Sequence, residues 1–110
     1  MINETIARIE TRVRETGTIR EEEKVELINL LSELKAEVTE LSATHKEQAE
    51  SIACFTDVSA HEATREEKDS RLLSLSVDGL TSSVEGFENS HPGLVQIVNR
   101  ISVMLASMGI

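Results

Sequence analysis

The chain has 110 residues with 20 acidic and 11 basic side chains, which gives a net charge of −9 at pH 7. It is long enough for one domain and too short for two ordinary ones. An acidic surface without a basic face argues against binding to nucleic acid or to an anionic membrane, because both present phosphates. Two Phe, no Trp or Tyr and a single Pro are typical of a helix-rich protein.

The first helix is predicted over residues 3–15, where apolar side chains recur at helical spacing and Gly17 follows as a stop signal. Thr18 and Glu21 then have the spacing of a capping box, in which each side chain binds the other's backbone N–H. A second helix should therefore begin there. The opening residues lack the basic and apolar regions of a secretion signal, so we expect a cytoplasmic protein.

The second helix carries a heptad seam of large aliphatic residues: Leu27, Leu31, Leu34, Val38 and Leu41. No Pro or Gly interrupts the chain from Thr18 to Thr56. An unbroken helix over that stretch would be about 55 Å long, which exceeds the size of a compact domain of this length. Either the helix breaks near residues 42–45 or the molecule is elongated. We favour the elongated form.

The third helix is predicted after a turn at residues 56–59, with Ser59 and Glu62 as a second capping box. The chain stays polar up to Arg71 and then regains an apolar seam. Pro92 disfavours a helical residue before it and is tolerated in a first helical turn. It should therefore separate the third helix from a fourth.

The fourth helix, predicted over residues 92–108 with Gly109 as its stop, is the most apolar. From Leu94 onward its only charged residue is Arg100. One stripe of apolar residues and a second, weaker one that includes Val95 and Val103 predict that this helix has neighbours on two sides.

These elements predict an all-α fold with a single domain over residues 1–110. Its core is a four-helix bundle, residues 2–41 and 72–110, built on a long antiparallel helical hairpin. Residues 42–71 should protrude as a two-helix arm with a poor apolar seam. The expected core and interface residues come from the last two helices: Leu73, Val77, Leu80, Val84, Phe87, Leu94, Ile97, Val98, Ile101, Met104, Leu105 and Met108.

The end of the chain resembles an uncharacterised bacterial family of short helical proteins, described as a domain of unknown function. The resemblance lies in a Phe-Glu-x-x-His-Pro-x-Leu sequence at residues 87–94, in Asn99-Arg100 and Leu105, and in Met-Gly-Ile at residues 108–110. Weaker similarity covers the first helix and the start of the second, up to Val38. Residues 42–71 have no counterpart in it. The resemblance implies a small helical protein and supplies no activity, cofactor or catalytic residue.

Few side chains have the pattern of a chemical site. Glu88 and His91 have the Glu-x-x-His spacing of di-iron bundles, but the motif occurs once instead of twice. A structural role at a helix end is the simpler interpretation. His45 should lie at a seam and His61 in solvent. Cys54 has no second Cys to pair with and is more plausibly a packing residue than a nucleophile.

We therefore expect a non-enzymatic helical interaction or structural module with no cofactor. Its partners should be a second copy of itself, as a homodimer, or an unidentified protein, and neither nucleic acid nor a membrane. One alternative is a metal-binding bundle enzyme that uses Glu88 and His91. Another is a protein that inserts its last helix into a membrane surface.

Overall fold

Five α-helices make up the part of the chain that the computed structural model describes, residues 2–108, and no strand occurs within it. The helices are α1 (Ile2–Glu15), α2 (Glu21–Ser42), α3 (Lys46–Thr64), α4 (Ser70–Ser83) and α5 (Pro92–Met108). The predicted all-α class is confirmed. The expected stop at Gly109 lies outside the described residues.

The expected long second helix breaks after Ser42, so the elongated form that we favoured is wrong. Thr44 and His45 both donate their backbone N–H groups to the Leu41 carbonyl, which closes a turn in place of the next helical turn. The Ser42 hydroxyl donates to the Thr39 carbonyl at 2.6 Å. Ser and Thr side chains compete with the helix for backbone partners in this way. The described residues span 37 × 24 × 21 Å.

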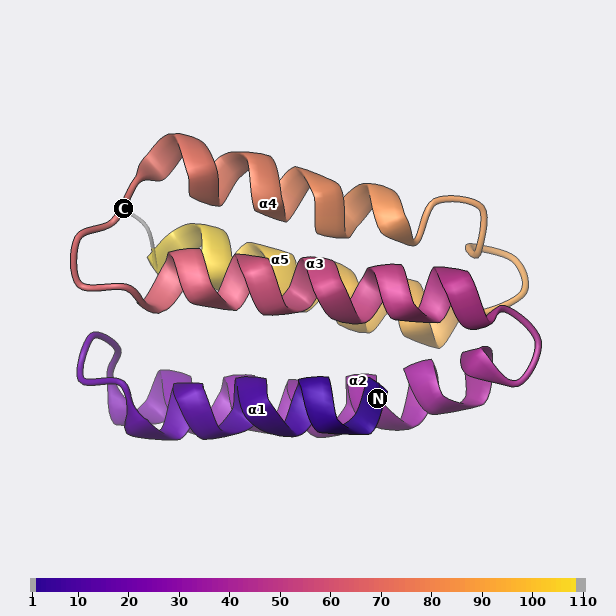
Figure 1. Cartoon of the computed structure of the whole chain (residues 1–110), viewed down its shortest axis with the longest axis horizontal. Coiled ribbons are helices and arrows are strands. Elements are labelled where there is room, and N and C mark those ends of the chain that lie inside the picture. Colours follow the sequence, from indigo (N-terminus) through magenta and orange to yellow (C-terminus); the bar gives the residue numbers. More distant parts are fainter. Residues whose placement is uncertain (1, 109–110) are drawn as a thin grey trace.

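Residues 42–71 do not form a protruding arm, because α3 lies within the bundle (Figure 1). It packs against each of the other four helices, with α1 and α4 on either side of it and α2 and α5 behind. Its buried face consists mainly of small residues: Ala49, Ile52, Ala53, Thr56, Ser59, Ala60 and Ala63. A search for large aliphatic residues misses such a face.

The predicted turn at residues 56–59 and the capping box at Ser59 both fall inside α3 and are wrong. Thr56 is fully buried there, and its hydroxyl donates to the Ile52 carbonyl at 2.7 Å. A buried hydroxyl that bonds to its own helix carries little desolvation cost. Thr56 can therefore serve as a core residue.

The start of α4 is fixed by Asp69, whose carboxylate accepts the backbone N–H groups of Arg71 at 3.0 Å and Leu72 at 3.1 Å. This N-cap satisfies two donors that a helix end leaves without partners.

The second helix, α2, starts later than predicted. Arg20, not Thr18, precedes it, and the Arg20 N–H reaches Glu23 Oε1 at 3.4 Å.

The core is filled by large aliphatic side chains of α1, α2 and α5, together with Leu73 and Leu80 of α4. Of the twelve expected core and interface residues, eight are buried: Leu73, Leu80, Val84, Leu94, Val98, Ile101, Leu105 and Met108. The other four are partly buried and pack against the core: Val77, Phe87, Ile97 and Met104.

The second apolar stripe of α5 lacks the cover that we predicted for it. Val103 is 70% exposed and Ala106 is also exposed, whereas Val95 is half-buried against the core. The three neighbours of α5 within the described residues are α2, α3 and α4, and they enclose its stronger stripe. No helix in the described part of the chain is long and apolar enough to cross a membrane.

Candidate interaction surface

Several large apolar side chains are exposed to solvent on the face shared by α3 and α4. Among the described residues, six large hydrophobic side chains are exposed, and four of them belong to these two helices. They are Leu75 (58% exposed), Val58 (49%), Leu72 (43%) and Phe55 (40%). We call these four residues the α3–α4 face.

The two helices approach closely at Gly79, which fixes how their residues line up. A Cβ atom at Gly79 would overlap the Phe55 ring, so the ring lies directly against the α4 backbone. Because α3 and α4 run in opposite directions (Figure 1), Val58, one turn beyond Phe55, is level with residues 75 and 76. Leu72 lies one turn further along. The four side chains therefore lie on adjacent turns of the two helices.

Charged residues border the patch on α4. Arg71 and Asp78 are both exposed, and neither forms an ion pair with any residue between 2 and 108. They are seven residues apart, which is about two helical turns, so they lie on one line along the helix. Leu75 lies between them. On α3, Cys54 is exposed as a free thiol next to Phe55.

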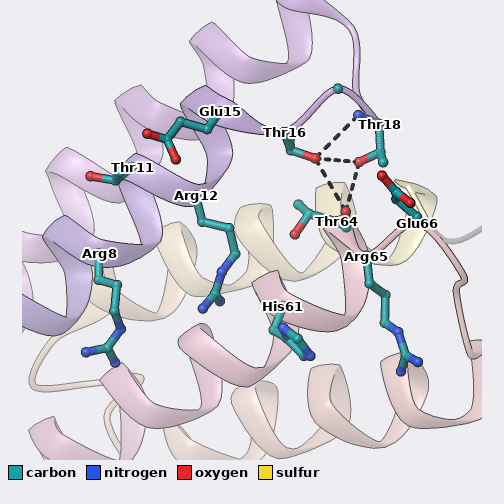
Figure 2. A pocket seen from close by; sticks show the side chains of 11 residues that line it. Arg8, Thr11, Arg12, Glu15, Thr16, Thr18, His61, Thr64, Arg65 and Glu66 are labelled. Atoms are coloured by element: carbon teal, nitrogen blue, oxygen red, sulfur yellow. Dashed lines mark hydrogen bonds between the residues drawn. The ribbon is translucent and has the colours of Figure 1, made fainter.

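A groove of about 820 Å³ lies between α1 and α3 (Figure 2). Arg8 and Arg12 project into it from α1. Both guanidinium groups donate to the Asp57 carboxylate, at 2.8 Å from Arg8 and 3.0 Å from Arg12. The Arg12 side chain also reaches the Asp57 backbone carbonyl at 3.4 Å. Asp57 thus ties α1 to α3.

At the other end of the groove, the α1–α2 loop is joined to the end of α3. The Thr16 and Thr18 hydroxyls both donate to the Thr64 carbonyl, at 3.4 and 3.1 Å (Figure 2). This carbonyl belongs to the last turn of the helix, where the backbone acceptors lack helical partners. Thr18, which we expected to cap α2, fastens the α1–α2 loop instead.

Arg65 lies beside this junction and donates to Glu62 Oε1 at 2.8 Å. That hydrogen bond and the negative charge of Glu62 raise the pKa of the Arg65 guanidinium above its ordinary value. The three arginines of the groove are therefore paired with carboxylates. Glu15 and Glu66 also line it, so it holds no excess of positive charge for an anionic ligand.

Glu88 and His91 both have hydrogen-bond partners within their own loop, between α4 and α5. Glu88 accepts the Gly86 backbone N–H at 3.0 Å, and Gly86 has a φ of +96°, a conformation that favours glycine. His91 Nδ1 lies 3.0 Å from Ser90 Oγ. Within residues 2–108, no three His, Cys, Asp or Glu side chains are grouped so that they could hold a metal ion.

Three rings meet at this end of the bundle. The His45, Phe87 and His91 rings contact each other edge to face, with centroids 5.4 to 6.3 Å apart. His45 comes from the α2–α3 loop, and the other two from the α4–α5 loop. His45, which we expected at a helical seam, is exposed and joins the two loops. His61 is exposed, as we expected.

A family model described as a domain of unknown function (DUF4404) matches residues 2–110 of this sequence. The chain belongs to this family. The resemblance seen in its C-terminal residues is confirmed, and the match runs through residues 42–71, for which we had found no counterpart. The DUF4404 assignment carries no activity. No curated protein and no solved structure matches the chain.

The α3–α4 face is the surface that sequence reasoning missed. Phe55 was not among the expected core and interface residues, and Val58 was placed in the predicted turn at residues 56–59. The sequence does contain one signal, since Leu72 and Leu75 fall outside the seam that starts at Leu73. Two apolar stripes on one helix indicate that one of them faces something other than the core.

Proposed function

We propose that this DUF4404 protein is a non-enzymatic interaction module that forms a homodimer through the α3–α4 face. The observation that carries the proposal is the gathering of four exposed apolar side chains on two adjacent helices. A patch of this kind is typical of a protein contact, because burying it recovers the free energy lost by leaving it in water.

The charges at the edge of the face favour a second copy as the partner. In a two-fold symmetric dimer the same patch is used twice, so a residue at one end of it meets a residue from the other end. Arg71 and Asp78 have opposite charges at opposite ends of the patch. The surface is therefore able to complement itself.

An enzymatic role has less support in the arrangement of polar groups. The carboxylate of Glu88 is engaged by the backbone of its own loop, and the groove arginines are engaged by Asp57 and Glu62. The proposal therefore includes no cofactor. It places the protein in the cytoplasm, where a lone exposed thiol such as Cys54 stays reduced.

The substitution Leu75→Asp tests the proposal by placing a charge at the middle of the face. We expect the unaltered chain to reach twice its mass of 12.1 kDa in sedimentation velocity as its concentration is raised. Four side chains make a small interface, so the dimer should dissociate on dilution. The Leu75→Asp chain should remain at the monomer mass, because a buried unpaired carboxylate is costly.

Val103→Asp is the matched control, since it introduces the same charge at an apolar residue of α5 that is even more exposed. It should leave the dimer intact. Thermal unfolding followed by circular dichroism establishes that both variants keep the fold. A wild-type chain that is monomeric at every concentration contradicts the proposal, as does a Leu75→Asp chain that dimerises normally.

A further inference from the structure

The exposed side of α4 has a charge pattern that selects one way of pairing two copies. Arg71, Leu75 and Asp78 follow one another along the helix at spacings of four and three residues, so their side chains form a single line. All three are exposed. The line thus runs from a positive end through an apolar centre to a negative end.

An ion-pair partner within the same copy would compete with a charge contact to a second copy. Arg71 and Asp78 have no such partner among the described residues. Their separation, about 10 Å along the helix axis, is too large for them to neutralise each other.

We infer that the homodimer pairs α4 with the α4 of a second copy in the antiparallel direction, so that Arg71 of each copy faces Asp78 of the other. The inference rests on the proposed function and adds the geometry of the contact. The two-fold axis passes between residues 74 and 75, which brings the two Leu75 side chains together.

The antiparallel direction follows from electrostatics. With two parallel α4 helices in register, Arg71 would face Arg71 and Asp78 would face Asp78, and like charges at close range repel. Reversing one helix replaces both repulsions with attractions. Val58 is level with Leu75, so it lies at the middle of the same contact. Phe55 and Leu72 then cover the apolar area on either side.

Charge reversal tests the pairing. In the Arg71→Asp chain, two carboxylates oppose each other at both ends of the contact, and in the Asp78→Arg chain two guanidinium groups do so. We expect each change to raise the dimer dissociation constant by about tenfold, the scale of a few weak surface charge contacts. The doubly reversed chain, Arg71→Asp with Asp78→Arg, should recover the wild-type dissociation constant to within about threefold.

Mixing the two single variants gives a second readout that a folding defect could not produce. Each variant alone should be largely monomeric, while an equimolar mixture should form a heterodimer, because opposite charges then meet at both ends. Arg100→Asp and Glu33→Arg are the controls for net charge, since both residues are exposed on other helices. Neither control should change the dissociation constant by more than about twofold.

The outcomes separate this inference from the proposed function. If Leu75→Asp abolishes the dimer but charge reversal has no effect, or if the double variant stays as weak as the singles, the antiparallel pairing is overturned and the homodimer stands. If the wild-type chain never dimerises, both are overturned. Recovery in the double variant together with heterodimer formation supports both.

Discussion

The buried hydroxyl groups of α3 differ in whether they have a hydrogen-bond partner. Thr56 and Thr64 bury their hydroxyl groups against carbonyls of their own helix, each at 2.7 Å. Ser59 is fully buried on the same helix, yet its Oγ has no hydrogen-bond partner among the described residues. A buried polar atom without a partner retains its full desolvation cost. Ser59 is thus a weak point at atomic scale.

Replacing that hydroxyl should stabilise the protein. We expect Ser59→Ala to raise the free energy of unfolding by about 1 kcal/mol, because it removes an unsatisfied buried group and fits the same space. Ser76→Ala is the matched control. Ser76 is buried on the facing helix, but its hydroxyl donates to the Leu73 carbonyl at 2.9 Å.

Both substitutions gain the same helix propensity, so the difference between them isolates the unsatisfied hydroxyl. Urea unfolding of the two variants and the parent chain measures it. If Ser59→Ala stabilises the protein no more than Ser76→Ala does, then Ser59 Oγ has a partner in solution.

At the scale of the helices, the spacing between α3 and α4 depends on Gly79 and Phe55. Glycine within a helix costs about 1 kcal/mol relative to alanine. At this position the cost is offset by the contact between the Phe55 ring and the α4 backbone. The two residues should therefore be coupled energetically.

A double-mutant cycle measures this coupling. In the Phe55→Ala chain, Gly79→Ala should stabilise the protein by about 1 kcal/mol, the full propensity gain. In the parent chain, the same change should be neutral or destabilising, because the added methyl group expels the ring. Urea unfolding of the four chains, at a concentration where each is monomeric, gives the result. Equal effects in both backgrounds contradict the contact.

The helices also differ in how far the sequence determines them. The Leu and Val seam of α2 and the apolar stripe of α5 are strong signals, because large aliphatic residues at helical spacing have few other uses. Most of α5, including its start at Pro92, is thus predictable. The face of α3 is built mainly from Ala, Ser and Thr, which also occur on exposed helix surfaces. Nothing in that stretch alone distinguishes a buried helix from an exposed one.

The sequence alone did not determine whether the chain breaks between α2 and α3, and the rest of the fold depends on that break. Residues 42–45 contain no Pro or Gly, and the turn arises because Ser42 and Thr44 side chains bond to preceding carbonyls. Such bonds also occur in unbroken helices, so the break depends on the burial that folding back provides. The α3–α4 face follows from that packing, and sequence reasoning could not locate it without the break.

At the scale of the whole molecule, α1 is held by its apolar stripe, by hydrogen bonds to α2 and by ion pairs to α3. Among the described residues α1 packs only on α2 and α3. Ile6, Ile9 and Val13 are fully buried. Asp57 adds the attachment to α3 through Arg8 and Arg12. The Asp57 carboxylate therefore links α3 to α1, a helix that is far from it in the sequence.

Removing the charge of Asp57 should weaken the whole bundle. We expect Asp57→Asn to lower the free energy of unfolding by about 1 kcal/mol, since Arg12 is only partly exposed and loses a charged hydrogen bond. The loss should shrink in high salt, which screens the pair. Glu33→Gln, an exposed site on α2, is the control and should be neutral.

Thermal unfolding at low and high salt provides the measurement. A loss that does not depend on salt would assign the effect to packing and not to charge. Hydrogen exchange adds a spatial readout, because amide protons of α1 should lose protection before those of α5 in the Asp57→Asn chain.

The small side chains of α3 limit which sequences this architecture can accept. Because Ala49, Ala53, Ala60 and Ala63 lie against neighbouring helices, any larger residue there would push those helices apart. A randomised library at these four codons, selected for folded protein, should return Ala, Ser and Gly almost exclusively. The volume of the interior would then be adjustable mainly at the large aliphatic residues of α1, α2, α4 and α5, so adaptation to heat or cold would proceed chiefly through those helices.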